Sequence, residues 1–430
     1  MARRGPGVHW DTPGSLTAGY MGFFGLGVGE NGRYKKRRGK TIHAKNGMRR
    51  SASAGCDRLP MRDALEVQRR PTMKKHIRIE STGQFTIGID VSDRTSCYCI
   101  LDHAGEICGE GKLRSTPEAY RQQFGGMAPA VIALEAGTHS RWMSALLREC
   151  GHEVIVANPR RLRLLTTSDK KNDPEDARTL AEMAWAKPAL LAPVRHRSAE
   201  AQRDLNLVRA RDLIVEARTK LINGVRCLVK GFGGRVPKCA SGQFTKHADL
   251  HLPEEARRAS APLLELIDEL SQRILEYDEM LEHEAETRYR QTALLTQVSG
   301  VGTLTAMAFV LTIEDPHRFA RSRDVGCYLG LRPKQQDSGD RSPQLRITKA
   351  GDSYLRKILV SSAHYIIGPF GPDTDLRRWG LKLCERGGKN AKKRAVVAVA
   401  RKLAVLLHRL WVTGEVYEPL RSQAQEAVAA

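Results

Sequence analysis

Phe85-Thr86-Ile87-Gly88-Ile89-Asp90-Val91 is the stretch that decides the fold, because it is an apolar run that ends in an acidic residue. Its length and its β-branched residues predict a buried strand. Cys97-Tyr98-Cys99-Ile100-Leu101 predicts a second strand, and residues 106–113 predict a third that pairs back after a turn at 102–105. Three neighbouring strands therefore open this part of the chain.

Helices and strands alternate after these three strands. We expect helices at 115–124, 141–149 and 173–186, and strands at 131–135 and 153–157. Ser115 or Thr116 is placed to cap the first of these helices. Three strands followed by helix–strand alternation is the RNase H-like (RuvC-like) order. We therefore predict an α/β domain at residues 84–196.

Two long helices are expected next, at 198–230 and 261–290, joined by a link at 231–253. In the first helix, apolar residues recur every seven positions. In the second, spacings of four and three alternate, which predicts an a/d seam. The expected seam residues are Leu207, Ile214, Leu221 and Leu228 in the first helix, and Leu263, Ile267, Leu270, Ile274, Tyr277 and Leu281 in the second. Residues 197–292 are therefore predicted to form an antiparallel hairpin or an intermolecular coiled coil; two amphipathic helices on a globular core are the alternative.

Residues 293–415 predict a further, mostly helical domain, followed by a tail at 416–430. Near its start, Gly300 and Gly302 flank an apolar residue between amphipathic segments, as in a helix-hairpin-helix element. Such a hairpin offers backbone N–H groups and a helix N-terminus to a phosphate. A tight helix–helix turn without a ligand is the alternative.

Residues 1–83 differ from the rest, since they are rich in Gly, Arg and Ser and lack apolar periodicity. They match GxGxxG at 27–32, but no strand precedes the motif and a basic run follows it, so a dinucleotide site is excluded. We expect a disordered basic extension. Met73, just before the first strand, is a candidate for the true start of the protein.

The chain has 430 residues and a net charge of +22, which predicts a polyanionic partner, above all nucleic acid. It has no run of 18 apolar residues, so a membrane-spanning helix is not expected. The nine cysteines are scattered and form no CxxC pair, which predicts reduced thiols in a cytoplasmic protein. Cys239, His247 and His251 fit no zinc-finger spacing.

Four acidic residues mark a candidate metal site. Asp90 and Glu135 each end an apolar strand, whereas Asp173 and Asp176 open a helix with an offset that places both on one face. Carboxylates in this arrangement can hold two divalent ions, and hard oxygen ligands favour Mg²⁺ or Mn²⁺. Isolated acids at such positions often only cap helices or face water, so the prediction depends on all four occurring in this order.

Ser338, in Asp337-Ser338-Gly339, is the candidate nucleophile, although this tripeptide is also a common turn. A serine hydroxyl needs activation by a base, a metal or positive charge, and Gly339 permits close approach of a DNA backbone. Five nearby cations are predicted to bind phosphate, namely Lys334, Arg341, Arg346, Lys349 and Arg356. Ser342 is the second candidate.

Taken together, these motifs resemble the DEDD-type insertion-sequence transposases, relatives of the Piv site-specific invertase. The resemblance rests on the three acidic motifs, on the Gly300/Gly302 hairpin, and on 328–333, 337–339, 347–356 and 391–407, and covers about 84–415. Asn172 stands where the family more often has Thr.

The resemblance implies a RuvC-like N-terminal domain and a C-terminal domain in which Ser338 is the nucleophile. It also implies DNA as substrate, Mg²⁺ as cofactor, a structured bridge RNA as guide, and dimers that pair into tetramers. Because Ser338 and the acids lie in different domains, a composite site between subunits is expected. A RuvC-like nuclease that acts by hydrolysis and a non-catalytic nucleic-acid-binding protein are the alternatives.

Overall fold

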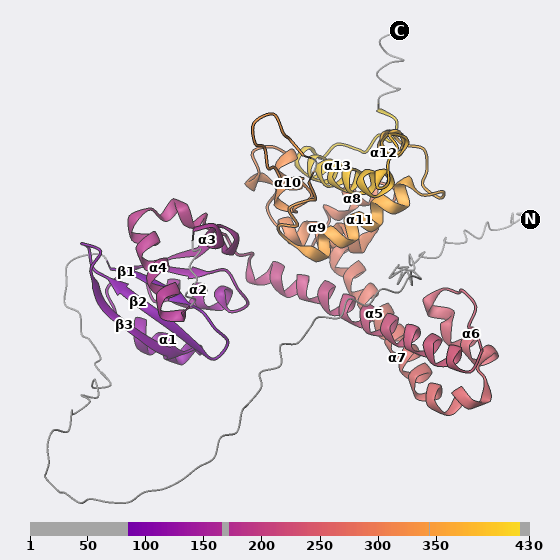
Figure 1. The fold of residues 1–430 in the computed structure, drawn as a ribbon, viewed down its shortest axis with the longest axis horizontal. Helices are drawn as coiled ribbons and strands as arrows, with labels where there is room; N and C mark the ends of the chain where they lie inside the picture. Colours follow the sequence, from indigo (N-terminus) through magenta and orange to yellow (C-terminus); the bar gives the residue numbers. More distant parts are fainter. Residues whose placement is uncertain (1–84, 166–171, 344, 422–430) are drawn as a thin grey trace, which may run out of the picture. The chain divides into compact units, whose positions relative to one another are not determined.

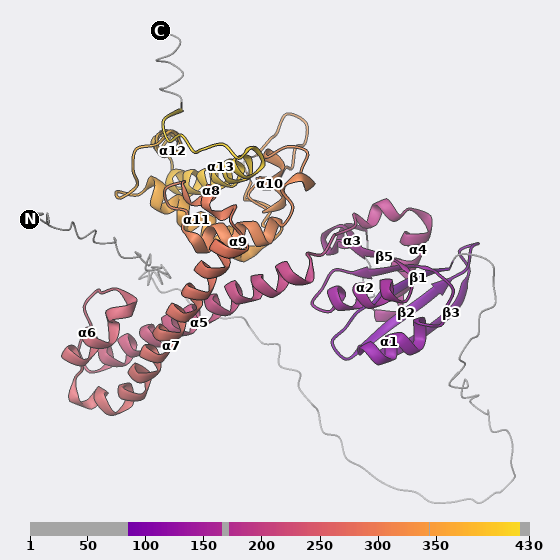
Figure 2. The same ribbon diagram turned by 180° about the vertical axis from the view of Figure 1, so that it is seen from behind.

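The computed structural model describes residues 85–165, 172–343 and 345–421. The expectations for residues 1–83 and for residues 422–430 of the tail therefore lie outside the described residues. The described chain divides into two compact units, residues 85–196 and 197–421, each considered by itself (Figures 1 and 2).

The first unit is built on a five-stranded mixed sheet in the order β3-β2-β1-β4-β5. Its strands are β1 (Thr86–Asp90), β2 (Thr95–Leu101), β3 (Ile107–Arg114), β4 (Val131–Glu135) and β5 (Glu153–Ala157). β1, β2 and β3 pair antiparallel, whereas β4 and β5 add in parallel to the other side of β1. The three leading strands and the alternation that follows them were predicted correctly.

Helices cover both faces of this sheet. On one face, α1 (Pro117–Phe124) and α2 (Ser140–Glu149) pack against Ile87, Ile89 and their neighbours. On the other face, α4 (Asp173–Ala186) packs against Ala133 and the cysteines of β2. α3 (Pro159–Leu165) and the 3₁₀ turn η1 (Pro188–Leu191) complete the unit. Thr116 caps α1 as expected, because its Oγ1 accepts a hydrogen bond from Ala119 N.

The second unit begins with a helical hairpin formed by α5 (Ala199–Gly231) and α7 (Glu254–Thr287), which run side by side (Figures 1 and 2). The α7 seam was predicted in part: Ile267, Ile274 and Leu281 are buried, whereas Leu263, Leu270 and Tyr277 are half-buried. The seam closes within one chain, as in the predicted antiparallel hairpin. A short turn η2 (Ser241–Gln243) and α6 (Phe244–His251) fill the segment that was expected to be a link.

The predicted face of α5 is wrong. Leu228 is exposed, and Leu207, Ile214 and Leu221 are only half-buried, whereas the fully buried apolar residues of this helix lie on an adjacent face. These are Ala201, Leu205, Val208, Ile222, Val225 and Val229. Ala201, Val208, Ile222 and Val229 keep the seven-residue period but lie one position after the predicted set, which turns the buried face by about 100°. The start of this face packs against the C-terminal helices and its end against α6 and α7.

The start of α7 also differs from the prediction, because the helix begins at Glu254 and contains Pro262 in its interior. A proline inside a helix removes one backbone donor, here the one that would pair with Arg258 O. Arg258 is exposed, so water can satisfy the freed carbonyl. An interior proline is therefore tolerated at this position.

The remaining helices form a bundle around one apolar helix. α9 (Thr303–Ile313) is buried on every side from Ala306 onward, which is typical of a helix at the centre of a core. α8 (Thr292–Thr296) and α11 (Ser353–Ile367) pack against α9 and against α13 (Ala391–Thr413). η3 (Pro316–Arg318), α10 (Arg323–Tyr328) and α12 (Asp375–Glu385) pack against α13. The mostly helical C-terminal part was predicted correctly.

Two expected absences can be compared with the described residues. None of the described helices is long and apolar enough to cross a bilayer. The eight described cysteines form no disulfide, and Cys239 and its neighbours form no metal-binding group in the described chain.

Candidate active site

Asp90 and Glu135 lie next to each other at one edge of the sheet. β1 and β4 are parallel, and Ile89 pairs with Leu134, so the following residue of each strand is Asp90 and Glu135. Side chains alternate between the faces of a strand, which places Asp90 on the face of Gly88 and Glu135 on the face of Ala133. That face is the one covered by α4. Both carboxylates are half-buried.

The first turns of α4 approach β1 closely at Gly88. A Cβ on Gly88 would lie 2.0 Å from Ala177 O and 2.4 Å from Ala181 N, so only glycine permits this approach. Asp173 and Asp176 open α4 directly before Ala177, and Pro174 occupies its first turn as expected. Asp173 is exposed and Asp176 half-buried. α4 therefore brings its acidic end to the edge that carries Asp90.

Asp173 and Asp90 both lie near Cys97 of β2. The pKa of Cys97 is raised first by burial and then by the charges of Asp173 and Asp90, against the lowering effect of Lys112. Cys97 pairs with Asp90 on one side and with Lys112 on the other, so one row crosses three strands on a single face. Lys112 places a cation beside the acids, and nothing in the sequence pattern singled it out.

A histidine links the two loops that follow the acidic strands. Trp142 Nε1 donates to His139 Nδ1 at 3.1 Å, and His139 Nε2 lies 3.1 Å from Asp93 Oδ1. Because an indole N–H is only a donor, Nδ1 is the acceptor and Nε2 donates to Asp93. Asp93 follows Asp90 by three residues and His139 follows Glu135 by four. This bridge was not predicted, although those short spacings could have suggested it.

The described residues contain no group of three or more His, Cys, Asp or Glu side chains close enough to hold a metal ion. Asp90, Glu135, Asp173 and Asp176 therefore share one edge of the first unit without forming a closed cage. Their oxygen ligands are of the type that Mg²⁺ and Mn²⁺ prefer. The four-carboxylate metal site stays a prediction.

Ser338 lies on an exposed β-hairpin arm of the second unit, residues 332–348. Lys334 N donates to Arg346 O at 2.9 Å and Thr348 N donates to Arg332 O at 2.9 Å, which pairs the two sides of the arm. At the tip, Ser338 and Arg341 exchange two backbone hydrogen bonds of 3.1 Å around Gly339 and Asp340. Gly339 has φ +53°, as the first central residue of such a turn requires.

Two glycines hold the base of the arm. A Cβ on Gly330 (φ +69°) would lie 2.1 Å from Ala350 N, and one on Gly351 (φ +68°) would lie 2.1 Å from Tyr328 O. The two chain segments therefore cross in backbone contact. Arg356 Nη1 reinforces the crossing by donating to the carbonyl oxygens of Leu329 and Ala350 at 3.0 and 2.7 Å.

The side chains around Ser338 are mostly exposed. Lys334, Arg341 and Arg346 are exposed, and they form no ion pair with any residue that the structure describes. Lys349 is exposed as well. Ser342, the second candidate, donates from Oγ to Asp337 Oδ1 at 2.7 Å. Arg356 instead supports the arm, a role that the sequence did not indicate, and its phosphate binding stays a prediction.

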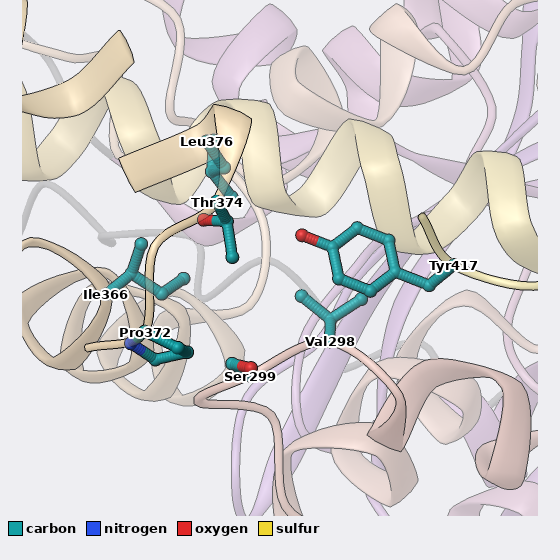
Figure 3. Close-up of a pocket in the computed structure, with 7 residues that line it drawn as sticks. All are labelled: Val298, Ser299, Ile366, Pro372, Thr374, Leu376 and Tyr417. Carbon is teal, nitrogen blue, oxygen red and sulfur yellow. The ribbon is translucent and has the colours of Figure 1, made fainter. Parts of the chain in front are cut away.

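Gly300 and Gly302 lie in the short loop between α8 and α9. α8 is only five residues long, so the predicted hairpin has one short helix and one long one. Figure 3 shows the residues behind this loop, with Val298 and Ser299 facing Ile366, Leu376 and Tyr417. Tyr417 N also donates to Gln297 Oε1 at 2.9 Å, so the C-terminal segment fixes the loop.

These two sites, an acidic edge on an α/β unit and an exposed serine arm on a helical unit, are those expected of a DNA-processing enzyme. Residues 292–374 match the family described as "Transposase IS116/IS110/IS902 family", and residues 87–233 match a DEDD transposase family.

Similar proteins agree with this match. The chain is 28% identical to "Transposase for insertion sequence element IS1111A" of Coxiella burnetii, over 83% of this chain and 98% of that protein. It is 32% identical to "Putative transposase y4pF/y4sB" of Sinorhizobium fredii, over 69% and 76% of the two chains. A shorter similarity, 30% over 28% of this chain and 36% of the other, relates it to "Pilin gene-inverting protein" of Moraxella lacunata. The chain belongs to the IS110/IS116 family of DEDD transposases.

Proposed function

We propose that this transposase cuts DNA at the ends of an insertion sequence and rejoins it through a covalent phosphoserine. The observation that carries the proposal is the register of β1 and β4, which sets Asp90 beside Glu135 under the acidic start of α4. The strand order β3-β2-β1-β4-β5, with helices on both faces, supports an RNase H-like fold for this unit.

Asp90, Glu135, Asp173 and Asp176 would hold Mg²⁺ or Mn²⁺ at this edge. When bound, the metal stabilises the negative charge that develops on the phosphate oxygens. Lys112, in the same row as Asp90, adds a cation that can bind the DNA backbone near the acids. The bridge from His139 to Asp93 keeps the two acidic loops in fixed positions.

Ser338 would supply the nucleophile. Its Oγ forms a bond to the phosphorus, the bond from phosphorus to the leaving deoxyribose oxygen breaks, and the serine proton passes to that oxygen. The phosphodiester is thus exchanged for a phosphoserine, so the reverse step can join new ends without ATP. The exposed Lys334, Arg341 and Arg346 would bind the phosphates on either side.

The partners follow from the same proposal. A net charge of +22 suits long contacts with nucleic acid, both element-end DNA and a structured guide RNA. The four acidic residues and Ser338 lie on separate units. Oligomerisation would bring them together, so that Ser338 of one chain attacks DNA held at the acidic residues of another chain. A bacterial cytoplasm supplies all these components.

The decisive test is a denaturing gel of the protein with Mg²⁺, element-end DNA and transcribed flanking RNA. We expect a detergent-resistant protein–DNA adduct with the native chain and with Ser342→Ala, and none with Ser338→Ala. Adduct loss with Ser342→Ala alone would move the nucleophile to that residue. Cleavage without any adduct would replace the proposal with hydrolysis.

Two further arms test the partners. Omission of the RNA should abolish the adduct if a guide is required. A mixture of Asp90→Asn and Ser338→Ala chains should regain activity if the site is composite, and a mixture as inactive as its components would exclude sharing between subunits.

A further inference from the structure

A groove of about 1020 Å³ opens in the second unit, a size typical of ligand pockets. It is lined by α5, by the loop that carries Gly300 and Gly302, by the start of α9, and by α11. None of the residues assigned to cleavage lines it. The packing shown in Figure 3 fixes the loop from behind, so this wall of the groove is formed in advance.

The start of α9 faces the groove with its backbone donors open. Gly302 is the N-cap residue and no side chain caps the helix. A Cβ on Gly302 would meet nothing within 4 Å, so the space beside these N–H groups is empty of protein. The N–H groups and the dipole of an 11-residue helix favour an anion here.

Arg218 gives an independent indication of an anion. It lines the groove and is only 7% exposed, and its Nη1 donates to Ser271 Oγ at 3.1 Å while its buried Nε has no partner. Burial and the nearby charge of Arg211 lower its pKa, against the raising effect of the charge of Asp278. No carboxylate of the described chain lies within ion-pair distance of it. Asp278 is itself paired with Arg211, and a buried cation without an ion-pair partner of its own is costly, so a bound anion would lower that cost.

Apart from Arg218 and Lys220, the charged side chains of the groove are in ion pairs, and the lining as a whole has four cationic and two acidic side chains. Lys357 Nζ contacts Asp212 and Glu216 at 2.8 and 2.9 Å, and Arg211 pairs with Asp278. Arg218 and the exposed Lys220 are left to meet a ligand. Their charge makes the groove complementary to a phosphate and not to a cation.

An aromatic wall completes the groove. Tyr365 is 41% exposed and its ring lies over Gly300, where a Cβ would come within 2.8 Å of Tyr365 Cδ1. A half-exposed ring beside a phosphate site is the arrangement by which proteins stack the bases of single strands.

We propose that this groove binds a nucleotide of single-stranded DNA, with its phosphate at the start of α9 and its base on Tyr365. The proposal rests on the proposed function, since cutting and rejoining exposes single-stranded DNA. Gly300 and Gly302 would then contact a single displaced strand of DNA, whereas the hairpin was predicted only to contact phosphates of nucleic acid in general.

Gly302 allows a sharp test, because Asp and Asn both cap helices well and fit the open space. Fluorescence anisotropy with a labelled short oligodeoxythymidylate, in full-length chains that carry Ser338→Ala, would measure affinity. We expect Gly302→Asp to bind about tenfold more weakly than Gly302→Asn, because the added carboxylate repels phosphate. Both variants should melt within about 2 °C of the parent chain, so a binding difference cannot come from unfolding.

The base is tested by Tyr365→Ala against Phe370→Ala, an exposed aromatic outside the groove. We expect a loss of roughly tenfold for Tyr365→Ala and none for Phe370→Ala. Equal affinities within either pair would refute the site. An equal loss with duplex DNA would reduce it to a general backbone contact, and oligouridylate bound more than tenfold tighter would assign it to RNA. Because binding is measured without Ser338, failure here leaves the adduct assay unaffected, and failure of the adduct assay leaves this result unaffected.

Discussion

Gly88→Ala is the change whose effect can best be calculated from the structure. The new Cβ would lie 2.0 Å from Ala177 O and 2.4 Å from Ala181 N, both backbone atoms of α4 that cannot rotate away. α4 would have to retreat by about 1 Å or more to restore ordinary contact, and overpacking of this kind costs roughly 3 kcal/mol. A shift of that size at the acidic edge also lowers catalysis by about 100-fold.

Hydrogen exchange followed by mass spectrometry is the appropriate assay, because it measures the stability of α4 separately from the second unit. A loss of about 3 kcal/mol should speed exchange of the α4 amides by roughly 100-fold. The matched control is Gly137→Ala, in the loop after β4, whose Cβ would meet nothing within 4 Å. Native exchange rates in Gly88→Ala would refute the argument that this glycine sets the position of α4.

Three other changes test separate features. Gly330→Ala should destabilise the base of the serine arm by about 3 kcal/mol and abolish the protein–DNA adduct. Its control is Gly387→Ala, which is also at positive φ but in open space and should cost only about 1 kcal/mol. Equal melting temperatures for the two variants would contradict this. Asp204→Asn should lower the free energy of unfolding in urea by about 3 kcal/mol, because buried Asp204 accepts a hydrogen bond from Tyr289 Oη at 2.6 Å and pairs with Arg288 at 2.8 Å. A loss of unfolding free energy below about 1 kcal/mol would show that the ion pair is not needed for stability. Burial raises the pKa of Cys99 from 9.0 to about 12, so its thiol stays neutral in the folded chain at pH values where the thiol of the unfolded chain ionises. The free energy of unfolding should therefore fall between pH 9.0 and about 12, and it should fall by less in Cys99→Ala than in the native chain. Parallel curves of unfolding free energy against pH for the two chains would exclude this cause.

The five strands of the first unit and its helices α1, α2 and α4 could be predicted from the sequence, because their signals are local, whereas α3 and η1 were not predicted. Apolar runs that end in Asp90 and Glu135 fix two strand ends, and Asn172-Asp173-Pro174 fixes the start of a helix. The contact between Gly88 and Ala177 could not be predicted in the same way, since it joins residues far apart in the chain. His139 and Lys112 escaped notice because a lone histidine or lysine has no pattern until its neighbours are placed.

The second unit was harder because periodicity gives a face and not its partner. The heptads of α7 identified the buried residues Ile267 and Ile274, but Leu270 between them is only half-buried. In α5 the buried residues Ala201, Val208, Ile222 and Val229 also follow a seven-residue period, but this set lies one position after the predicted one, so the period was right and the face was wrong. The arm of Ser338 shows the same limit: Asp337-Ser338-Gly339 predicted a turn, but the pairing of Lys334 with Arg346 and the crossing at Gly330 depend on contacts across the arm.

The crossing of Gly330 and Gly351 has a consequence for how this enzyme can evolve. The two ends of the 332–348 segment meet where Gly330 and Gly351 are in backbone contact, so the segment leaves and re-enters the core at one place. Insertions, deletions or wholesale exchange of the segment between relatives would leave the helices below unchanged. Selection can therefore alter the reach and charge of the tip independently of the stability of the scaffold, provided that the two glycines and Ile347, which packs against the helical core, are kept.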